Sequence, residues 1–78
     1  MNTMDTLVVL EEVAASLRES AEEIGSPATG YDEGRLTAYY EALAMILTQC
    51  RVVGIEPGDI GLAGFSPDTL LRGVKLAA

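Results

Sequence analysis

The sequence contains no histidine and no tryptophan, and it has only one cysteine and one phenylalanine among its 78 residues. A single cysteine, Cys50, excludes an internal disulfide, and the absence of histidine removes the usual ligands of zinc and haem. A general base at neutral pH would have to be a carboxylate, lysine, tyrosine or cysteine with a perturbed pKa. The composition therefore argues against an enzyme and predicts neither a cofactor nor a metal site.

Basic residues are also scarce, since five of them stand against twelve acidic residues and give a net charge of −7. Residues 1–33 contain eight acids and one arginine and carry all of this charge, whereas residues 34–78 are neutral. Direct binding to nucleic acid or to an anionic membrane requires a basic face, so we predict neither. An acidic face instead keeps a protein soluble or meets a basic partner. The acidic candidates for partner binding are Glu11, Glu12 and Glu19.

No apolar run is long enough to cross a membrane. The longest strongly apolar run, residues 42–47, is far shorter than the roughly 20 residues that a membrane helix needs. The first residues lack the basic region of a secretory signal, so we predict a cytoplasmic protein. A chain of this length forms one domain and buries only about 60% of its unfolded surface. Without disulfides or a metal, we expect self-association or a partner to supply the missing burial.

The spacing of the apolar residues predicts an all-α fold. Apolar side chains recur at intervals of three and four over about residues 4–24 and again over about 31–53, which is typical of two helices. Asn2 or Thr3 is a candidate cap for the first helix, and Gly25 is expected to end it. Because the connector is short, we expect the two helices to form an antiparallel hairpin.

The remaining residues have a different composition. Residues 54–66 are rich in glycine and predict a compact loop, in which Pro57 opens at most a single helical turn. A serine, a proline and an aspartate at positions 66–68 then predict a short third helix over about 67–75. The glycines of the loop do not form a phosphate-binding motif, because no strand precedes them and no lysine follows. We predict that residues 1–78 form a single helical domain.

The second helix is apolar over most of its circumference. One stripe is expected to face the first helix, and it consists of Leu36, Tyr39, Leu43, Ile46, Cys50 and Val53. Apolar residues remain on both flanks, and a two-fold pairing of the same patch would bury them in a four-helix arrangement. The predicted dimer interface consists of Tyr40, Ala44, Leu47 and Met45.

Cys50 and Tyr31 need a separate interpretation. Cys50 lies on the apolar stripe, where a cysteine is usually a small buried hydrophobe rather than a nucleophile. Tyr31 begins the second helix, and tyrosine is enriched at protein interfaces because it contributes a large area at low entropic cost. We therefore predict that Cys50 is buried and that Tyr31 contributes to partner binding.

Two segments carry a resemblance to known proteins. The sequences GRLTAYYEAL at positions 34–43 and GLAGFSPD at positions 61–68 resemble small helical accessory proteins of bacteriophages and prophages of Gram-negative bacteria. The resemblance implies a protein that binds and modulates a host or phage protein, as an inhibitor or an adaptor, and it implies no catalytic residues. The leading hypothesis is a non-enzymatic protein-interaction module. The alternatives are a structural component of a larger assembly and an acidic mimic of nucleic acid.

Overall fold

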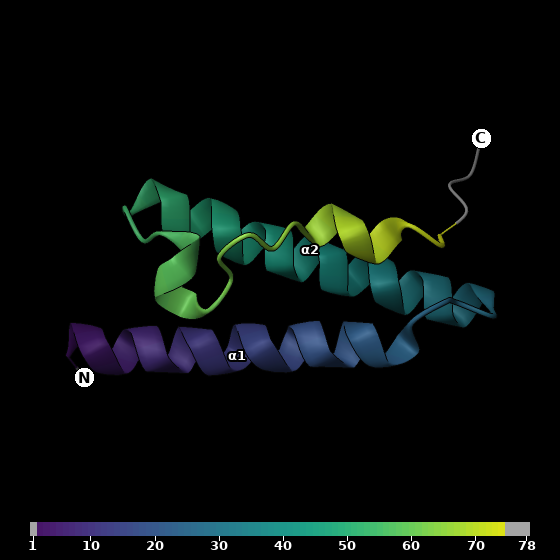
Figure 1. Ribbon diagram of the computed structural model, residues 1–78, viewed down its shortest axis with the longest axis horizontal. Coiled ribbons are helices and arrows are strands. Elements are labelled where there is room, and N and C mark those ends of the chain that lie inside the picture. The colour runs from purple at the N-terminus through teal and green to yellow at the C-terminus, as the bar shows by residue number, and fades with distance from the viewer. Residues whose placement is uncertain (1, 75–78) are drawn as a thin grey trace.

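Two long helices dominate the computed structural model, which describes residues 2–74 (Figure 1). Helix α1 spans Thr3–Ile24 and helix α2 spans Gly30–Val52, and they lie antiparallel. Two short 3₁₀-helices follow, η1 over Pro57–Ile60 and η2 over Pro67–Leu71. The described residues contain no strand, so the predicted all-α class and the helical hairpin are confirmed.

The ends of the long helices follow from local hydrogen bonds. The side-chain oxygen of Asn2 accepts a bond of 2.9 Å from the backbone N–H of Asp5, and this bond caps α1. The hydroxyl of Thr29 accepts a bond of 3.1 Å from the backbone N–H of Asp32 and caps α2 in the same way. Gly25 follows α1 with a φ of 60°, a value that favours glycine. Both helices start within one residue of the predicted positions.

The end of α2 corrects one prediction. Val53 was expected on the core stripe, but α2 ends at Val52 and the side chain of Val53 is 70% exposed. Val53 and Gly54 form a turn, in which Gly54 has a φ of 81°. The backbone N–H of Ile55 donates to the carbonyl of Cys50 at 2.8 Å, and Ile55 packs against the core. The turn therefore directs Val53 to solvent, and Ile55 packs against the core in its place.

The core lies where the two helices and the later residues meet. Seven apolar side chains of the described chain are buried: Ala14, Ala21, Leu36, Leu43, Cys50, Ile60 and Leu62. Cys50 is 5% exposed, so its predicted burial is confirmed. Two of the seven, Ile60 and Leu62, come from beyond the hairpin, so the hairpin alone does not complete the core.

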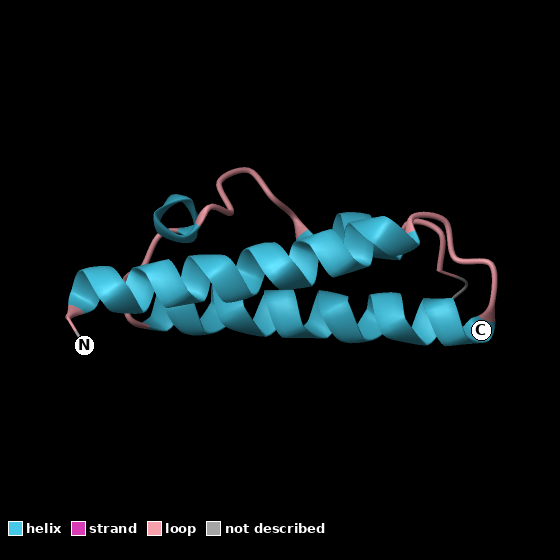
Figure 2. Cartoon of the chain, turned by 90° about the horizontal axis from the view of Figure 1, so that it is seen from below, coloured by secondary structure: helices cyan, strands magenta, loops and turns pink. Residues whose placement is uncertain are grey.

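Residues 55–74, which we call the C-terminal segment, run back along one side of the hairpin (Figure 2). Helix η1 lies against α1, and η2 lies against α2. The single turn expected at Pro57 is present as η1, within the predicted loop. The third helix is shorter than predicted, since η2 is a 3₁₀-helix that ends at Leu71, and Lys75 lies outside the described residues. The side chain of Ser66 does not cap this helix, and Gly73 disfavours its continuation.

Candidate functional site

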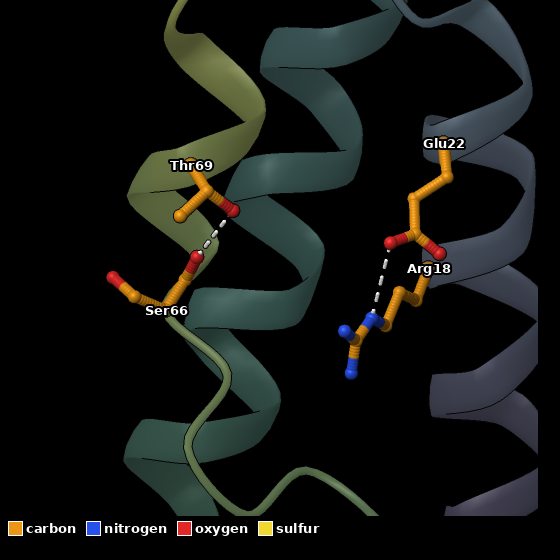
Figure 3. Close-up of polar contacts among 4 residues, drawn as sticks. All are labelled: Arg18, Glu22, Ser66 and Thr69. Atoms are coloured by element: carbon orange, nitrogen blue, oxygen red, sulfur yellow. Dashed lines mark hydrogen bonds and ion pairs between the residues drawn. The ribbon is translucent and has the colours of Figure 1, made fainter.

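The hairpin has two sides of different character. The covered face is the side on which the C-terminal segment lies, and Leu47, Phe65 and Pro67 line one hollow there. The guanidinium of Arg18 in α1 stacks over the ring of Phe65 at 4.3 Å. Its Nε lies 3.4 Å from a carboxylate oxygen of Glu22 (Figure 3). The hydroxyl of Thr69 donates to the carbonyl of Ser66 at 2.8 Å. Stacking and apolar contacts hold the segment against both helices.

The predicted dimer residues do not share one surface. Leu47 is half-buried and packs against the core beside the C-terminal segment. Ala44 and Tyr40 precede it by one and two turns on the same side of α2 and are also half-buried. Met45 lies on the other flank and is 64% exposed. The chain itself therefore covers the flank that contains Tyr40, Ala44 and Leu47 and leaves the Met45 flank open.

The opposite side, which we call the open face, carries no other described segment (Figure 2). Each helix contributes a stripe in which the intervals alternate between three and four residues, so its members share one side of the helix. The stripe of α1 consists of Thr6, Val9, Val13, Ser16 and Ser20. The stripe of α2 consists of Ala38, Ala42, Met45, Gln49 and Val52. None of these ten side chains is ionisable.

The open face exposes large apolar side chains. Among the described residues, eight large apolar side chains are exposed, and four of them belong to the two stripes: Val9 at 50%, Val13 at 47%, Met45 at 64% and Val52 at 74%. A shallow groove near the open end of the hairpin joins the two helices. Its lining is almost entirely apolar and consists of Leu10, Met45, Ile46, Gln49, Cys50, Val53 and Ile55. Both helices thus contribute exposed apolar side chains and no charged side chain to the stripes of the open face.

A polar cluster ends the open face near the connector. The guanidinium of Arg35 lies 5.7 Å from the ring centre of Tyr31 and 5.8 Å from that of Tyr39. It donates to the hydroxyl of Tyr39 at 3.4 Å, and this bond raises the pKa of Arg35 and lowers the pKa of Tyr39. A weaker effect of the same sign on the pKa of Tyr39 comes from its hydrogen bond with Ser20 of α1. The cluster links the two helices at this end.

The acidic candidates lie along α1. Glu11, Glu12 and Glu19 are all exposed, as the sequence suggested. The carboxylate of Glu11 approaches Gly61 so closely that a Cβ built on Gly61 would lie 3.2 Å from its Oε1. Because Gly61 also has a φ of 74°, a larger residue there would be strained.

Tyr31, the remaining candidate for partner binding, is 75% exposed at the connector end of α2. Glu11 lies thirteen residues before Ile24, the last residue of α1, so it is about 20 Å from that end along the helix. The structure therefore does not bring Tyr31 together with Glu11. The sequence analysis did not predict the open face as one surface, although the absence of charged residues from its two stripes was a signal that could have revealed it.

No chemical centre stands out in the described part of the chain. Within residues 2–74, no group of three or more cysteine, aspartate or glutamate side chains is placed to hold a metal ion. None of the helices in that range combines the length and the hydropathy that crossing a membrane requires. Comparison of the chain with protein-family profiles, curated proteins and solved structures found no match.

Proposed function

We propose that the chain is a non-enzymatic protein-interaction module, a homodimeric helical hairpin that binds and modulates another protein. The observation that carries this proposal is the open face, where two stripes without charged residues expose Val9, Val13, Met45 and Val52. Apolar side chains gathered on an exposed face are typical of surfaces that associate. The resemblance of residues 34–43 and 61–68 to phage accessory proteins supports the same class, with a site of action in the cytoplasm.

A second surface offers a place for the modulated partner. Helix α1 contains six acids and one arginine, and that arginine, Arg18, is engaged by Glu22 and Phe65. The carboxylates of Glu11, Glu12 and Glu19 are left to face solvent. A partner with a basic surface would be attracted to them. We assign the binding of the modulated partner to this acidic side of α1 and self-association of the chain to the open face.

The test is crosslinking in cells followed by affinity capture and then measurement of Kd with the purified partner. The triple variant Glu11→Gln, Glu12→Gln, Glu19→Gln is expected to weaken binding at least tenfold, about 1.4 kcal/mol. Binding of the wild type is expected to weaken with added salt, because surface charges are screened. A matched triple variant, Glu41→Gln, Glu56→Gln, Asp68→Asn, removes the same charge elsewhere and should bind like the wild type.

Other outcomes would redirect the proposal. Unchanged binding in the first triple variant would limit the α1 acids to solubility. Competition between duplex DNA and this chain for the partner would favour the nucleic-acid mimic. A chain that remains monomeric in cells and captures no protein would contradict the interaction module itself.

A further inference from the structure

We infer that a second copy of this chain covers the open face, so that two hairpins form a four-helix arrangement with the C-terminal segments outside. The inference rests on the proposed function, because it names the occupant of an interaction surface. It differs from the interface predicted from the sequence, which consisted of Tyr40, Ala44, Leu47 and Met45, because of these four only Met45 lies on the open face. The other three lie on the covered face, and the pairing surface now comes from both helices.

The residue types of the two stripes are the first argument. Val9, Val13, Met45 and Val52 expose apolar side chains, and the other members of the stripes are small or uncharged. A face of this kind is typical of a helix that packs against another helix, as in four-helix bundles. The small side chains of Ser16, Ala38 and Ala42 let a second helix approach closely, while Val13 and Met45 supply the larger contacts.

Charge is the second argument, and it favours a second copy over a different partner. The chain carries a net charge of −7, so two copies would repel each other if they met through their acidic sides. Neither stripe of the open face contains an acid or a base. A strongly charged partner would leave its own charges unpaired against such a surface, which is unfavourable. A second open face is neutral and apolar in the same way, so the surface is complementary to itself.

Surface area is the third argument. A compact monomer of 8.2 kDa exposes about 4,500 Å². This chain exposes 5334 Å², roughly 800 Å² more, because it is elongated. Its radius of gyration is 13.5 Å, against about 11.5 Å for a compact chain of this length. With principal extents of 43 × 22 × 19 Å, one long side of the molecule is large enough for the roughly 800 Å² that each partner loses in a stable interface of standard size.

Sedimentation equilibrium of the pure protein at micromolar concentration tests the inference. We expect twice the mass of one chain for the wild type. We also expect at least a hundredfold weaker association for Met45→Glu and for Val13→Glu. Val8→Glu is the matched control, because Val8 is 52% exposed on another side of α1, and it should remain dimeric. The side chain of Met45 is 64% exposed, so the glutamate should not disturb a folded protomer.

A second measurement does not depend on any variant. Because folding and association are linked in a dimer, the Tm of the wild type should rise with protein concentration. A monomeric wild type, a Tm independent of concentration, or a Met45→Glu protein with the wild-type mass would each overturn the inference. A monomer that still captures a partner would overturn the dimer alone. A monomer that captures nothing would overturn the proposed function as well.

Discussion

Replacing Ile60 with alanine tests whether the C-terminal segment is an essential part of the fold. Ile60 is 1% exposed and lies in η1, where it packs with Ala14, Leu43 and Leu62 in the core. Truncation of a buried isoleucine to alanine costs about 2–5 kcal/mol, because apolar contacts are lost and a cavity remains. The short η1 can move inward more easily than a long helix, so we expect about 2–3 kcal/mol.

This loss is large for so small a protein. At roughly 0.05–0.15 kcal/mol per residue, the free energy of unfolding of the whole chain is about 4–12 kcal/mol. The assay is urea unfolding followed by far-ultraviolet circular dichroism, at one fixed protein concentration because the proposed association would contribute to stability. With a urea dependence of about 1 kcal/mol per M, the midpoint should fall by about 2–3 M.

The control for this prediction is Val8→Ala, which truncates a side chain that is 52% exposed. We expect it to change the free energy of unfolding by no more than about 0.5 kcal/mol. If Ile60→Ala and Val8→Ala have the same midpoint, the C-terminal segment does not pack on the hairpin in solution. The covered face would then be open as well, and the assignment of the two faces would be wrong.

Two further predictions concern Cys50 and Tyr39. Cys50→Ala should lower the free energy of unfolding by about 1 kcal/mol. A thiol reagent should label the native protein slowly because the side chain is 5% exposed, and rapid labelling would contradict its burial. In an alkaline titration followed by ultraviolet absorbance, the hydroxyl of Tyr39 should ionise below its ordinary pKa of about 10. Arg35→Gln should reduce this shift, and the part that comes from the bond with Ser20 should remain. Because the pKa of Tyr39 is lower in the folded state, its ionisation stabilises the fold only at alkaline pH, and this contribution is lost as the pH falls through the folded-state pKa. The free energy of unfolding at neutral pH should therefore be unaffected. An unchanged tyrosine titration in Arg35→Gln would refute the role of the bond between Arg35 and Tyr39.

The helices could be predicted from the sequence because their signals are local. Asn2 and Thr29 cap the N-termini through bonds to residues three positions later, and such bonds depend on neighbouring residues alone. The burial of Cys50 followed from its place in a stripe of regular spacing. The prediction for Val53 was wrong for a local reason too, because the turn that contains Gly54 begins at Val53, the last residue of the predicted stripe.

The path of the C-terminal segment could not be predicted in the same way. Residues 54–66 have no periodicity, and α2 offers apolar side chains on both flanks, so the pattern does not say which flank is covered. Tyr40 and Leu47 lie on the covered flank, and Met45 and Val52 lie on the open one. The contact that distinguishes the covered flank is the stacking of Arg18 of α1 on Phe65.

This allocation of faces bears on the proposed dimer. Tyr40 and Leu47 pack within the protomer, and the open face is the surface proposed for association. A surface that pairs with its own copy about a two-fold axis is buried on both molecules at once, so the proposed assembly would stop at two chains. The acids of α1 would then lie outside the pair, and the proposed dimer would present two equivalent acidic surfaces. A chain-like assembly would require a second, different apolar patch, and the C-terminal segment covers the flank of α2 best suited to provide one.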